Sequence, residues 1–531
     1  MDRVFFNGKV YVERDRFEEA ILVRGDRIAL VGKNDEVLAA AGDCERVDLE
    51  GRTVIPGLND SHLHLQMLGI SLNEVQLYGC TSLAEVIRRG KEFLATHPLK
   101  DGAPLTGFGW NQDYFTDEVR MPNRYDLDQI TTDRPVIFSR ACGHAISANS
   151  YAIEHIGLTA DSAQPEGGEF GITDGEPNGL FFEHASSLLD PLRVPVTPEL
   201  LATQLKSGMD YAASMGLTTV QSNDLSESNY LKYLAAFDIL RAKDAITCRY
   251  WSQCSFTTAE NLIGFFSEGF KRGSGDNLVQ FGSVKLFIDG SLGARTALLR
   301  GPYADDPNAL GIKTLADDVF DDIVRISDEH NCTVVTHCIG DGAVENCINS
   351  YAKVIKDGTN PNRHGIVHCQ ITDVPLLERM QKLNICALVQ PIFIHYDMHV
   401  VRQRVGDALA ETSYAFGTLG RMGVPVSYGT DCPVEDLNPY DNIYCAVTRR
   451  DLNGGEIYLE KECVDRFTAI DNYTVGSAYT CFDENGRGRI KEGFLADFVV
   501  LDADIFTVPE DQIRAIRPVA TYLGGRVAYQ R

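Results

Sequence analysis

The chain has 531 residues, of which 44% are hydrophobic and 23% charged, a composition typical of a packed globular protein with more than one domain. Its formal net charge of −26 opposes binding to nucleic acid or to an anionic membrane, so we expect neither partner. The N-terminus has no apolar signal segment and no apolar run reaches the length of a membrane span, so we expect a cytoplasmic protein with reduced cysteines.

Both ends of the chain have the pattern of short β-strands. Near the N-terminus two strand pairs flank glycine-containing turns and predict hairpins: Val4–Phe6 with Lys9–Val12 around Asn7-Gly8, and Ala20–Val23 with Arg27–Val31 around Gly25-Asp26. Near the C-terminus the predicted strands are Phe498–Leu501, Val519–Tyr522 and Arg526–Tyr529. Because neither end is long enough for a stable sheet of its own, we predict that residues 1–55 and 485–531 form one composite β-sandwich domain.

Between the ends, apolar strands alternate with segments of helical spacing such as Asp317–Glu329 and Asp373–Lys382. The predicted strands are Thr218–Gln221, Ser283–Ile288, Thr333–Thr336, Gly365–His368, Ile385–Val389 and Pro425–Tyr428. Repeated β-then-α order predicts an α/β protein with a parallel sheet, and six or more units favour a closed (β/α)8 TIM-type barrel over residues 56–71 and 196–484.

One interval in this alternation, between His64 and Thr218, is several times longer than a βα unit. It includes the glycine- and proline-rich segment Gln164–Gly179. We predict a large inserted subdomain at residues 72–195, after the first barrel strand, that covers the active site.

His62-Leu63-His64 is the first candidate for metal binding. In an extended segment, residues two apart point the same way, so both imidazoles can reach one cation. A chain with 12 histidines can also contain such a pair by chance. The pair alone leaves both interpretations open.

His337 and His368 come where two predicted strands end. One such histidine is more often a polar residue satisfied by hydrogen bonds, but two on consecutive βα units lie at the face where barrel enzymes place catalytic groups. Asp431 follows the last predicted strand. An aspartate in such a turn is usually a cap or turn residue, and a carboxylate at this face can also bind metal and shuttle a proton.

Lys285 lies inside the predicted strand Ser283–Ile288, between Val284 and Leu286. A buried ammonium is costly, so a lysine in an apolar strand needs an explanation. Either the lysine lies at an edge or surface position, or CO₂ carbamylates it into an anionic ligand that bridges two cations.

Together, six residues resemble the metal site of the amidohydrolase superfamily: His62, His64, Lys285, His337, His368 and Asp431. In that superfamily HxH follows barrel strand 1, lysine strand 4, the histidines strands 5 and 6, and aspartate strand 8. The sequence is most similar to the YtcJ-like branch, which includes N-substituted formamide deformylase. The similar segments are Gly109-Trp110, Cys142-Gly143-His144, Val284–Thr296, His337–Asp341 and Thr430–Val434.

This resemblance spans essentially the whole chain and implies a hydrolase acting on carbon–nitrogen bonds other than peptide bonds. It implies two divalent cations, with zinc a suitable metal, and a CO₂-derived carbamate on Lys285 that bridges them. A metal-bound hydroxide would attack a small N-formyl or N-acyl amide, and Asp431 would accept and then return the proton. His62 and His64 would hold one ion, and His337 and His368 the other.

Several residues are candidate substrate contacts. By resemblance these are Trp110, His144, Glu183, Asp289 and Arg295, for which lid packing, ion pairing or helix capping is the alternative. His395 and Tyr396 follow a predicted strand and join them. His395 and His399 have the spacing of a zinc-protease motif, but Tyr396 stands where that motif needs Glu, so we exclude a protease of this type.

Two other functions fit the same fold. A deaminase of the same superfamily would use one metal and no bridging lysine, so Lys285 argues against it. A non-catalytic scaffold would be expected to lose ligands, whereas all six positions are filled. Cys338, Cys369 and Cys432 each follow a proposed ligand, and we expect them to be buried thiols packed against helices rather than ligands. A homodimer is common among such barrels, and no sequence feature tests it.

Overall fold

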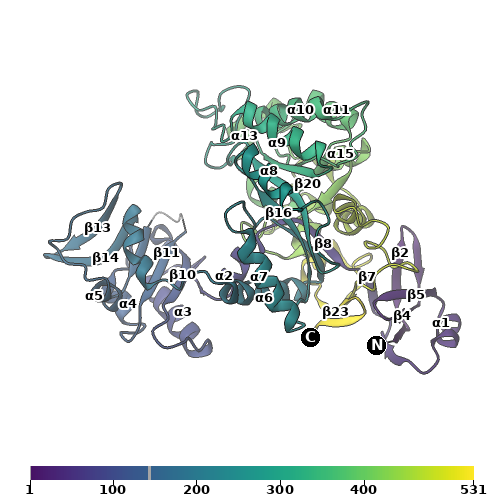
Figure 1. Cartoon of the computed structure of the whole chain (residues 1–531), viewed down its shortest axis with the longest axis horizontal. Coiled ribbons are helices and arrows are strands. Elements are labelled where there is room, and N and C mark those ends of the chain that lie inside the picture. Colours follow the sequence, from purple (N-terminus) through teal and green to yellow (C-terminus); the bar gives the residue numbers. More distant parts are fainter. Residues whose placement is uncertain (1, 142–144) are drawn as a thin grey trace. The chain divides into compact units, whose positions relative to one another are not determined.

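The computed structural model describes residues 2–141 and 145–531. The chain divides into two compact units, one of Met1–Gln66 with Gly208–Arg531 and one of Met67–Ser207 (Figure 1). The two boundaries fall within the helices α2 (Leu65–Ser71) and α6 (Pro198–Ser214). The second unit is therefore wider at both ends than the predicted insertion at 72–195.

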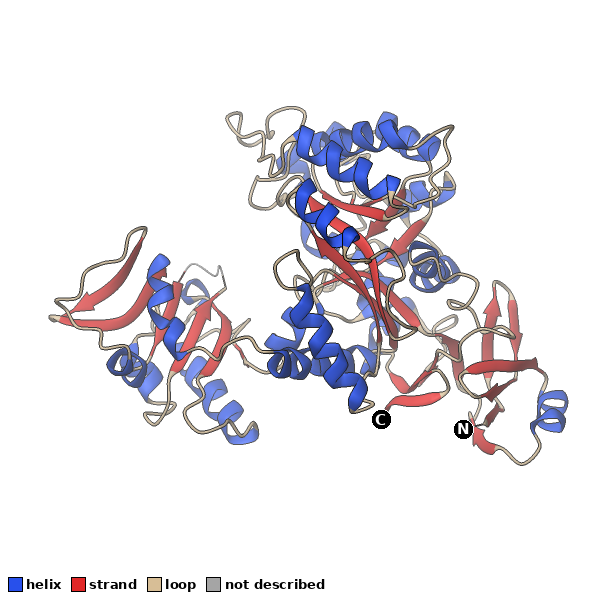
Figure 2. Ribbon diagram, viewed as in Figure 1, coloured by secondary structure: helices blue, strands red, loops and turns tan. Residues whose placement is uncertain are grey.

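The larger unit contains a parallel eight-stranded sheet, seen as red arrows in Figure 2. In sheet order its strands are β21 (Val426–Tyr428), β20 (Cys386–Val389), β19 (Gly365–His368), β18 (Thr333–Cys338), β17 (Val279–Phe287), β16 (Arg249–Ser255), β15 (Leu217–Ser222) and β8 (Leu58–Leu63). Backbone hydrogen bonds join the two ends of the sheet, since Asp431 N donates to His62 O and His64 N donates to Cys432 O, both at 2.8 Å. The nearly closed sheet fits the predicted TIM-type barrel.

Helices follow the barrel strands in the order expected of βα units. They are α7 (Tyr230–Ala242), α8 (Ala259–Ser267), α9 (Asp317–Glu329), α10 (Asp341–Val354), α11 (Val374–Leu383), α15 (Phe416–Arg421) and α16 (Pro439–Thr448). Shorter helical segments are η3 (Pro391–Phe393), α12 (Ile394–Asp397), α13 (Val401–Val405), α14 (Asp407–Ala410), η4 (Glu460–Glu462), α17 (Arg466–Asp471), η5 (Asn472–Gly476), α18 (Ser477–Thr480) and η6 (Glu510–Ala515). Among the described residues, none of the helices has both the length and the apolar character needed to span a bilayer.

The strand β16 has no counterpart among the predicted strands, although the other strands after the insertion were predicted. Its sequence, RYWSQCS, contains buried polar side chains instead of an apolar run. Arg249 and Gln253 are buried because partners from distant segments, Asp497 and His62, satisfy their hydrogen bonds. A search for apolar periodicity cannot detect such a strand.

Two further sheets in this unit use strands from the ends of the chain. One has the order β5 (Arg27–Gly32), β4 (Ala20–Arg24), β1 (Arg3–Phe6) and β6 (Glu45–Asp48). The other has the order β24 (Arg526–Gln530), β23 (Pro518–Leu523), β22 (Phe498–Leu501), β7 (Thr53–Pro56), β2 (Lys9–Glu13) and β3 (Arg16–Glu18). One hydrophobic core contains residues of both sheets, such as Phe5 and Phe498. The helix α1 (Asn34–Ala41) packs on the first sheet through Val37 and Ala41.

The two predicted N-terminal hairpins have different outcomes. The pairing of β4 with β5 around Gly25-Asp26 is confirmed. The hairpin around Asn7-Gly8 is wrong, because β1 and β2 belong to different sheets. The turn carries the chain from one sheet to the other, where both strands bury apolar side chains in the shared core, so long-range burial outweighs the local turn signal.

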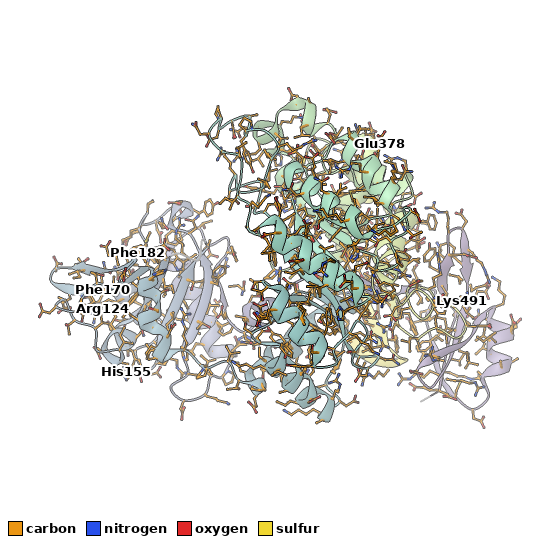
Figure 3. The ribbon with its side chains drawn as sticks, turned by 45° about the horizontal axis from the view of Figure 1, so that its top comes forward. Arg124, His155, Phe170, Phe182, Glu378 and Lys491 are labelled. Carbon is orange, nitrogen blue, oxygen red and sulfur yellow. The ribbon has the colours of Figure 1, made fainter. Side chains whose placement is uncertain are left out.

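The smaller unit, Met67–Ser207, contains a six-stranded mixed sheet with helices. Its elements are β13 (Gly168–Thr173), β14 (Glu176–Glu183), β12 (Ala145–Ala148), β11 (Val136–Arg140), β10 (Leu105–Trp110), β9 (Val75–Gln76), α3 (Leu83–Thr96), η1 (Gln112–Tyr114), α4 (Arg124–Asp128), α5 (Ser150–His155) and η2 (His184–Leu192). Phe170 and Phe182, labelled in Figure 3, pack in two separate hydrophobic clusters. The unit therefore has an apolar core on each side of its sheet.

A buried ion pair joins the barrel to the C-terminal strands, and its removal is expected to destabilise the fold. The Arg249 Nε and Nη2 atoms donate to both carboxylate oxygens of Asp497 at 2.7 and 2.9 Å. Asp497→Asn leaves Arg249 without its counter-ion and should lower the free energy of unfolding by about 3–5 kcal/mol. Denaturant titration measures this free energy. The control is Asp317→Asn in the exposed Lys313–Asp317 pair, which should lower the free energy of unfolding by no more than about 1 kcal/mol.

The Arg249–Asp497 pair also predicts how the stability loss caused by Asp497→Asn depends on pH. Burial opposes the charge of Asp497, but Arg249 outweighs burial and holds the pKa of that carboxyl below its usual 3.8. A lowered folded-state pKa means that the stabilisation is present above 3.8 and is lost as the pH falls through the lowered value. If Asp497→Asn and Asp317→Asn lower the free energy of unfolding equally at neutral pH, the buried Arg249–Asp497 pair stabilises the fold no more than an exposed pair, and the prediction is wrong.

Candidate metal centre

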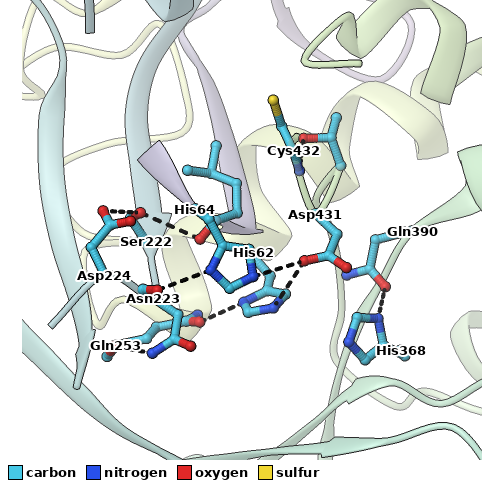
Figure 4. Close-up of polar contacts among 12 residues, drawn as sticks. His62, His64, Ser222, Asn223, Asp224, Gln253, His368, Gln390, Asp431 and Cys432 are labelled. Atoms are coloured by element: carbon cyan, nitrogen blue, oxygen red, sulfur yellow. Dashed lines mark hydrogen bonds and ion pairs between the residues drawn. The ribbon is translucent and has the colours of Figure 1, made fainter. Parts of the chain in front are cut away.

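The strand β8 brings His62 and His64 to the end of the barrel where the strands terminate (Figure 4). His62 is buried, and its Nδ1 lies 2.6 Å from Gln253 Oε1. His64 is partly exposed, and its Nδ1 lies 2.9 Å from the backbone oxygen of Asn223. In both rings Nδ1 therefore has a hydrogen-bond partner, and Nε2 faces Asp431.

His337 and His368 approach the same point from the neighbouring strands β18 and β19. Their ring centroids are 4.5 Å apart, and His368 lies 5.6 Å from His62. His337 Nδ1 lies 2.9 Å from Asp289 Oδ1, and His368 Nδ1 lies 2.8 Å from Gln390 Oε1. The structure thus brings all four predicted histidines together.

Asp431 lies in the turn after β21, with a left-handed backbone (φ 59°). Its Oδ1 atom lies 3.3 Å from Nε2 of both His62 and His64. The neighbouring residue Thr430 donates from its backbone N and its hydroxyl to the carboxylate of Asp60, at 3.0 and 2.7 Å to Oδ2. The hydrogen bonds to Asp60 therefore hold this turn against β8. In this position the Asp431 carboxylate lies beside His62 and His64.

The hydrogen bonds determine which ring nitrogens are free. A backbone carbonyl and a carboxylate can only accept, so the Nδ1 atoms of His64 and His337 carry their hydrogens. The Nε2 atoms of His64 and His337 then present lone pairs to the cluster. Asp431 Oδ1 is buried, has no hydrogen-bond partner among the described residues and lies 3.3 Å from Nε2 of His64 and of His62. Facing lone pairs of this kind need a positive charge between them. Burial acts to lower the pKa of His64, but contact with Asp431 raises it above 6.5, so a proton can lie between these two residues. A divalent cation supplies the positive charge for the whole donor set.

The donor set fits such a cation. Ligand atoms of His62, His368 and Asp431 all lie within 4.8 Å of one another. Burial lowers the pKa of His62 and of His368 well below 6.5, so both rings are neutral, the form that binds metal. Burial acts to raise the pKa of Asp431, but its contact with His64 and its attraction to the protonated forms of His368 and Lys285 hold it below 3.8.

Lys285 is fully buried in β17, between β16 and β18, which rules out the edge or surface position. Its Nζ has no hydrogen-bond partner among the described residues and lies 3.7 Å from the ring centroid of Phe287. Burial lowers its pKa to about 7, so the neutral amine is well populated at neutral pH. An unpartnered buried amine beside four histidines and an aspartate is the group that the carbamate hypothesis requires.

Two of the predicted substrate contacts have structural partners instead. Trp110 is fully buried in the core of the smaller unit and donates its indole N–H to Phe138 O at 3.0 Å, which matches the packing alternative. Asp289 accepts from His337 and from the backbone N atoms of Leu298, Ile339 and Gly340. These contacts orient His337 and match the ion-pairing and capping alternatives for Asp289, and its contact with substrate stays a prediction.

The other predicted contacts keep that role as a prediction. Glu183 is exposed in the smaller unit, and Arg295 pairs with Asp305 at 2.8 Å. His395 Nε2 lies 3.1 Å from Glu435, and Tyr396 is 59% exposed. His144 lies outside the described residues.

The thiols beside the proposed ligands are buried, and Cys369 Sγ lies 3.6 Å from Met380 Sδ on α11, as expected of packing against a helix. Cys338 contacts Cys347 on α10, and burial raises the pKa of the Cys338 thiol. All described cysteines are free. Buried thiols with a raised pKa stay protonated and are unreactive.

Three residues of the centre were not predicted: Asp60, Gln253 and Gln390. Of the three, Asp60 was detectable from the sequence, because a carboxylate two residues before His62 in an extended strand lies on the same side as that histidine. The two glutamines carry no signal, because their role depends on which strands the barrel brings close together.

Comparison with known proteins agrees with this geometry. A model of the amidohydrolase family matches residues 45–529. The chain is 32% identical to the putative amidohydrolase YtcJ of Bacillus subtilis over 97% of this chain and 98% of that protein. It is 26% identical to the N-substituted formamide deformylase of Arthrobacter pascens, over 98% and 96% of the two chains.

Among solved structures, a metal-dependent hydrolase of Pyrococcus horikoshii OT3 superposes with a TM-score of 0.78 at 28% identity. The match covers 96% of this chain and 99% of that one. The similarity therefore includes the residues of both compact units.

Proposed function

Because this chain belongs to the amidohydrolase family, we propose that it is a metal-dependent hydrolase that cleaves the carbon–nitrogen bond of an N-formyl or N-acyl amine or a related amide. The observation that supports this most is Asp431 Oδ1, buried 3.3 Å from two imidazole Nε2 atoms without a hydrogen bond. The amide class is suggested by the relative named as a formamide deformylase.

The proposed ligands divide into two sets. His62 and His64 would hold one ion and His337 and His368 the other, with carbamylated Lys285 between them and Asp431 as a further oxygen ligand. Imidazole and carboxylate donors suit zinc. When bound, a divalent cation supplies a Lewis acid that lowers the pKa of water toward ~7 and polarises a carbonyl.

The protein groups supply proton transfer and positioning. Asp431 accepts the proton of the attacking water and returns it to the leaving nitrogen. Phe287 packs against His337 and Phe393 against His368, with ring centroids 5.5 and 5.9 Å apart, and the two rings offer apolar contact beside the centre.

Two alternatives are weaker. A mononuclear deaminase of the same superfamily needs no bridging lysine, whereas Lys285 is buried beside the cluster with a free Nζ. A non-catalytic scaffold has no need to keep a complete donor set in which the described histidines are all oriented by hydrogen bonds.

A substrate panel with metal-reconstituted enzyme tests the proposal. We expect hydrolysis of N-formyl or N-acyl amines to exceed that of cyclic amides, esters and ring amidines, and to stop when a chelator removes the metal. Metal analysis should find about two equivalents per chain. Ring-amidine deamination with about one equivalent would favour the deaminase instead, and a purified protein that binds no divalent metal would favour the scaffold.

A further inference from the structure

Two buried glutamines contact the two most deeply buried histidines of the centre. Gln253 lies on β16 and Gln390 directly follows β20, and both are almost completely inaccessible to solvent. Their Oε1 atoms lie 2.6 Å from His62 Nδ1 and 2.8 Å from His368 Nδ1 (Figure 4). Each glutamine reaches its histidine from a different strand of the barrel.

The other end of each amide determines its orientation. Gln253 Nε2 donates to Ser61 O at 3.0 Å, and Gln390 Nε2 donates to Leu388 O at 3.2 Å. A backbone carbonyl can only accept, so it must face the NH₂ group of the amide, and the amide oxygen must face the imidazole. An amide oxygen can only accept as well, so the hydrogen of His62 and of His368 lies on Nδ1.

A neutral partner suits this position better than a carboxylate. The centre already contains the buried carboxylates of Asp60, Asp289 and Asp431. A further unpaired charge there would carry a desolvation penalty, whereas an amide satisfies both its own groups and the imidazole. Gln253 also binds Ser61, the neighbour of His62, so one side chain holds both the strand and the ring.

We propose that Gln253 and Gln390 are positioning residues that hold His62 and His368 in the Nδ1–H tautomer, with Nε2 ready to bind a cation before the cation arrives. This inference rests on the proposed metal-dependent function. It also predicts an observable in the metal-free protein, so it can be tested separately. Without the amide, the hydrogen can move to Nε2 and the ring can turn, and metal binding must then reverse both changes.

Metal affinity is the first readout. Gln253→Leu and Gln390→Leu should each weaken Zn²⁺ binding by about 10–100-fold in competition with a chelator. Gln253→Glu keeps an oxygen acceptor for His62 Nδ1. The extra buried charge and the lost donation to Ser61 O should lower its stability, but its Zn²⁺ affinity should stay within a few-fold of the wild type. The matched control is Gln221→Leu, since Gln221 is buried on β15 and donates to Ser477 O and Thr480 Oγ1 but to no histidine. It should lose stability and keep its metal affinity.

The tautomer is the second readout. In the metal-free wild type, ¹⁵N spectra of the histidine rings should assign the Nδ1–H form to His62 and His368. In each Leu variant the corresponding ring should shift toward the Nε2–H form, and Gln221→Leu should leave both rings unchanged.

The outcomes separate the two hypotheses. A wild type that binds no Zn²⁺ but shows both Nδ1–H rings contradicts the proposed function and supports the tautomer assignment. A wild type that binds Zn²⁺, with Leu variants of equal affinity and unchanged tautomers, overturns the inference. Equal losses in Gln253→Leu and Gln253→Glu also overturn it, because the acceptor is retained in Glu. If a Leu variant does not fold, the metal-free wild type decides the same point, because an Nε2–H ring at His62 or His368 there overturns the inference.

Discussion

Asp431→Asn is expected to lower kcat by about 10²–10⁴-fold while leaving most of the metal bound. The carboxylate is the group assigned to accept the proton of water and return it to the leaving nitrogen. Asparagine keeps one oxygen at the same position, which can remain a ligand, but it cannot accept a proton. The substrate is the best amide found in the panel, and metal content is measured on the same sample.

The matched control for this variant is Asp436→Asn, five positions further along the same loop. Asp436 contacts Tyr211 and has no described contact with the histidine cluster. The control should retain activity within a few-fold. Near-normal turnover in Asp431→Asn would remove this residue from the proton-transfer role, and loss of metal in the same variant would assign it to binding alone.

Lys285→Ala is expected to reduce metal content from about two equivalents to about one and to abolish measurable turnover, because the bridging ligand is lost. Carbamylation joins the neutral amine to CO₂, so that an N–C bond forms and one proton leaves. The burial that lowers the Lys285 pKa to about 7 makes the neutral amine available for this step at neutral pH and above.

A small carboxylate tests whether the missing group is an anionic oxygen ligand. Acetate or propionate added to Lys285→Ala should restore part of the second metal equivalent and part of the activity, and equimolar chloride should not. Wild-type metal binding that is insensitive to removal of CO₂ and bicarbonate, together with full binding in Lys285→Ala, would contradict the carbamate. About one equivalent in both proteins would indicate a mononuclear site.

Much of the centre was predictable because its residues occupy repeating positions along the chain. In a parallel barrel every strand ends at the same face, so a histidine or aspartate at the end of one strand must lie near those at the ends of the others. That rule alone places His62, His337, His368 and Asp431 together, and the structure brings them together. The same rule made Lys285 an exception, since it lies inside a strand rather than at its end.

The sequence by itself also determined local pairings whose signal is contained in a few residues. The helix at Asp317–Glu329 and the hairpin around Gly25-Asp26 have their predicted positions, because apolar spacing and turn residues specify them locally. Asn7-Gly8 carries an equally strong turn signal, yet the flanking strands enter different sheets. There the strand partners come from residues 16–24 and 45–56, which the turn residues do not specify.

Only the tertiary structure decided how the imidazole rings of the proposed ligands are oriented. Whether His62-Leu63-His64 presents metal-binding nitrogens depends on Gln253 and Asn223, which contact the two rings from the strands β16 and β15 or their ends. The physical reason is that a hydrogen bond orients an imidazole only when its partner is fixed nearby in space, and that partner can come from any distance along the chain. Strand order places the ligands at one face, and packing across the barrel determines which atom of each ligand points at the cation.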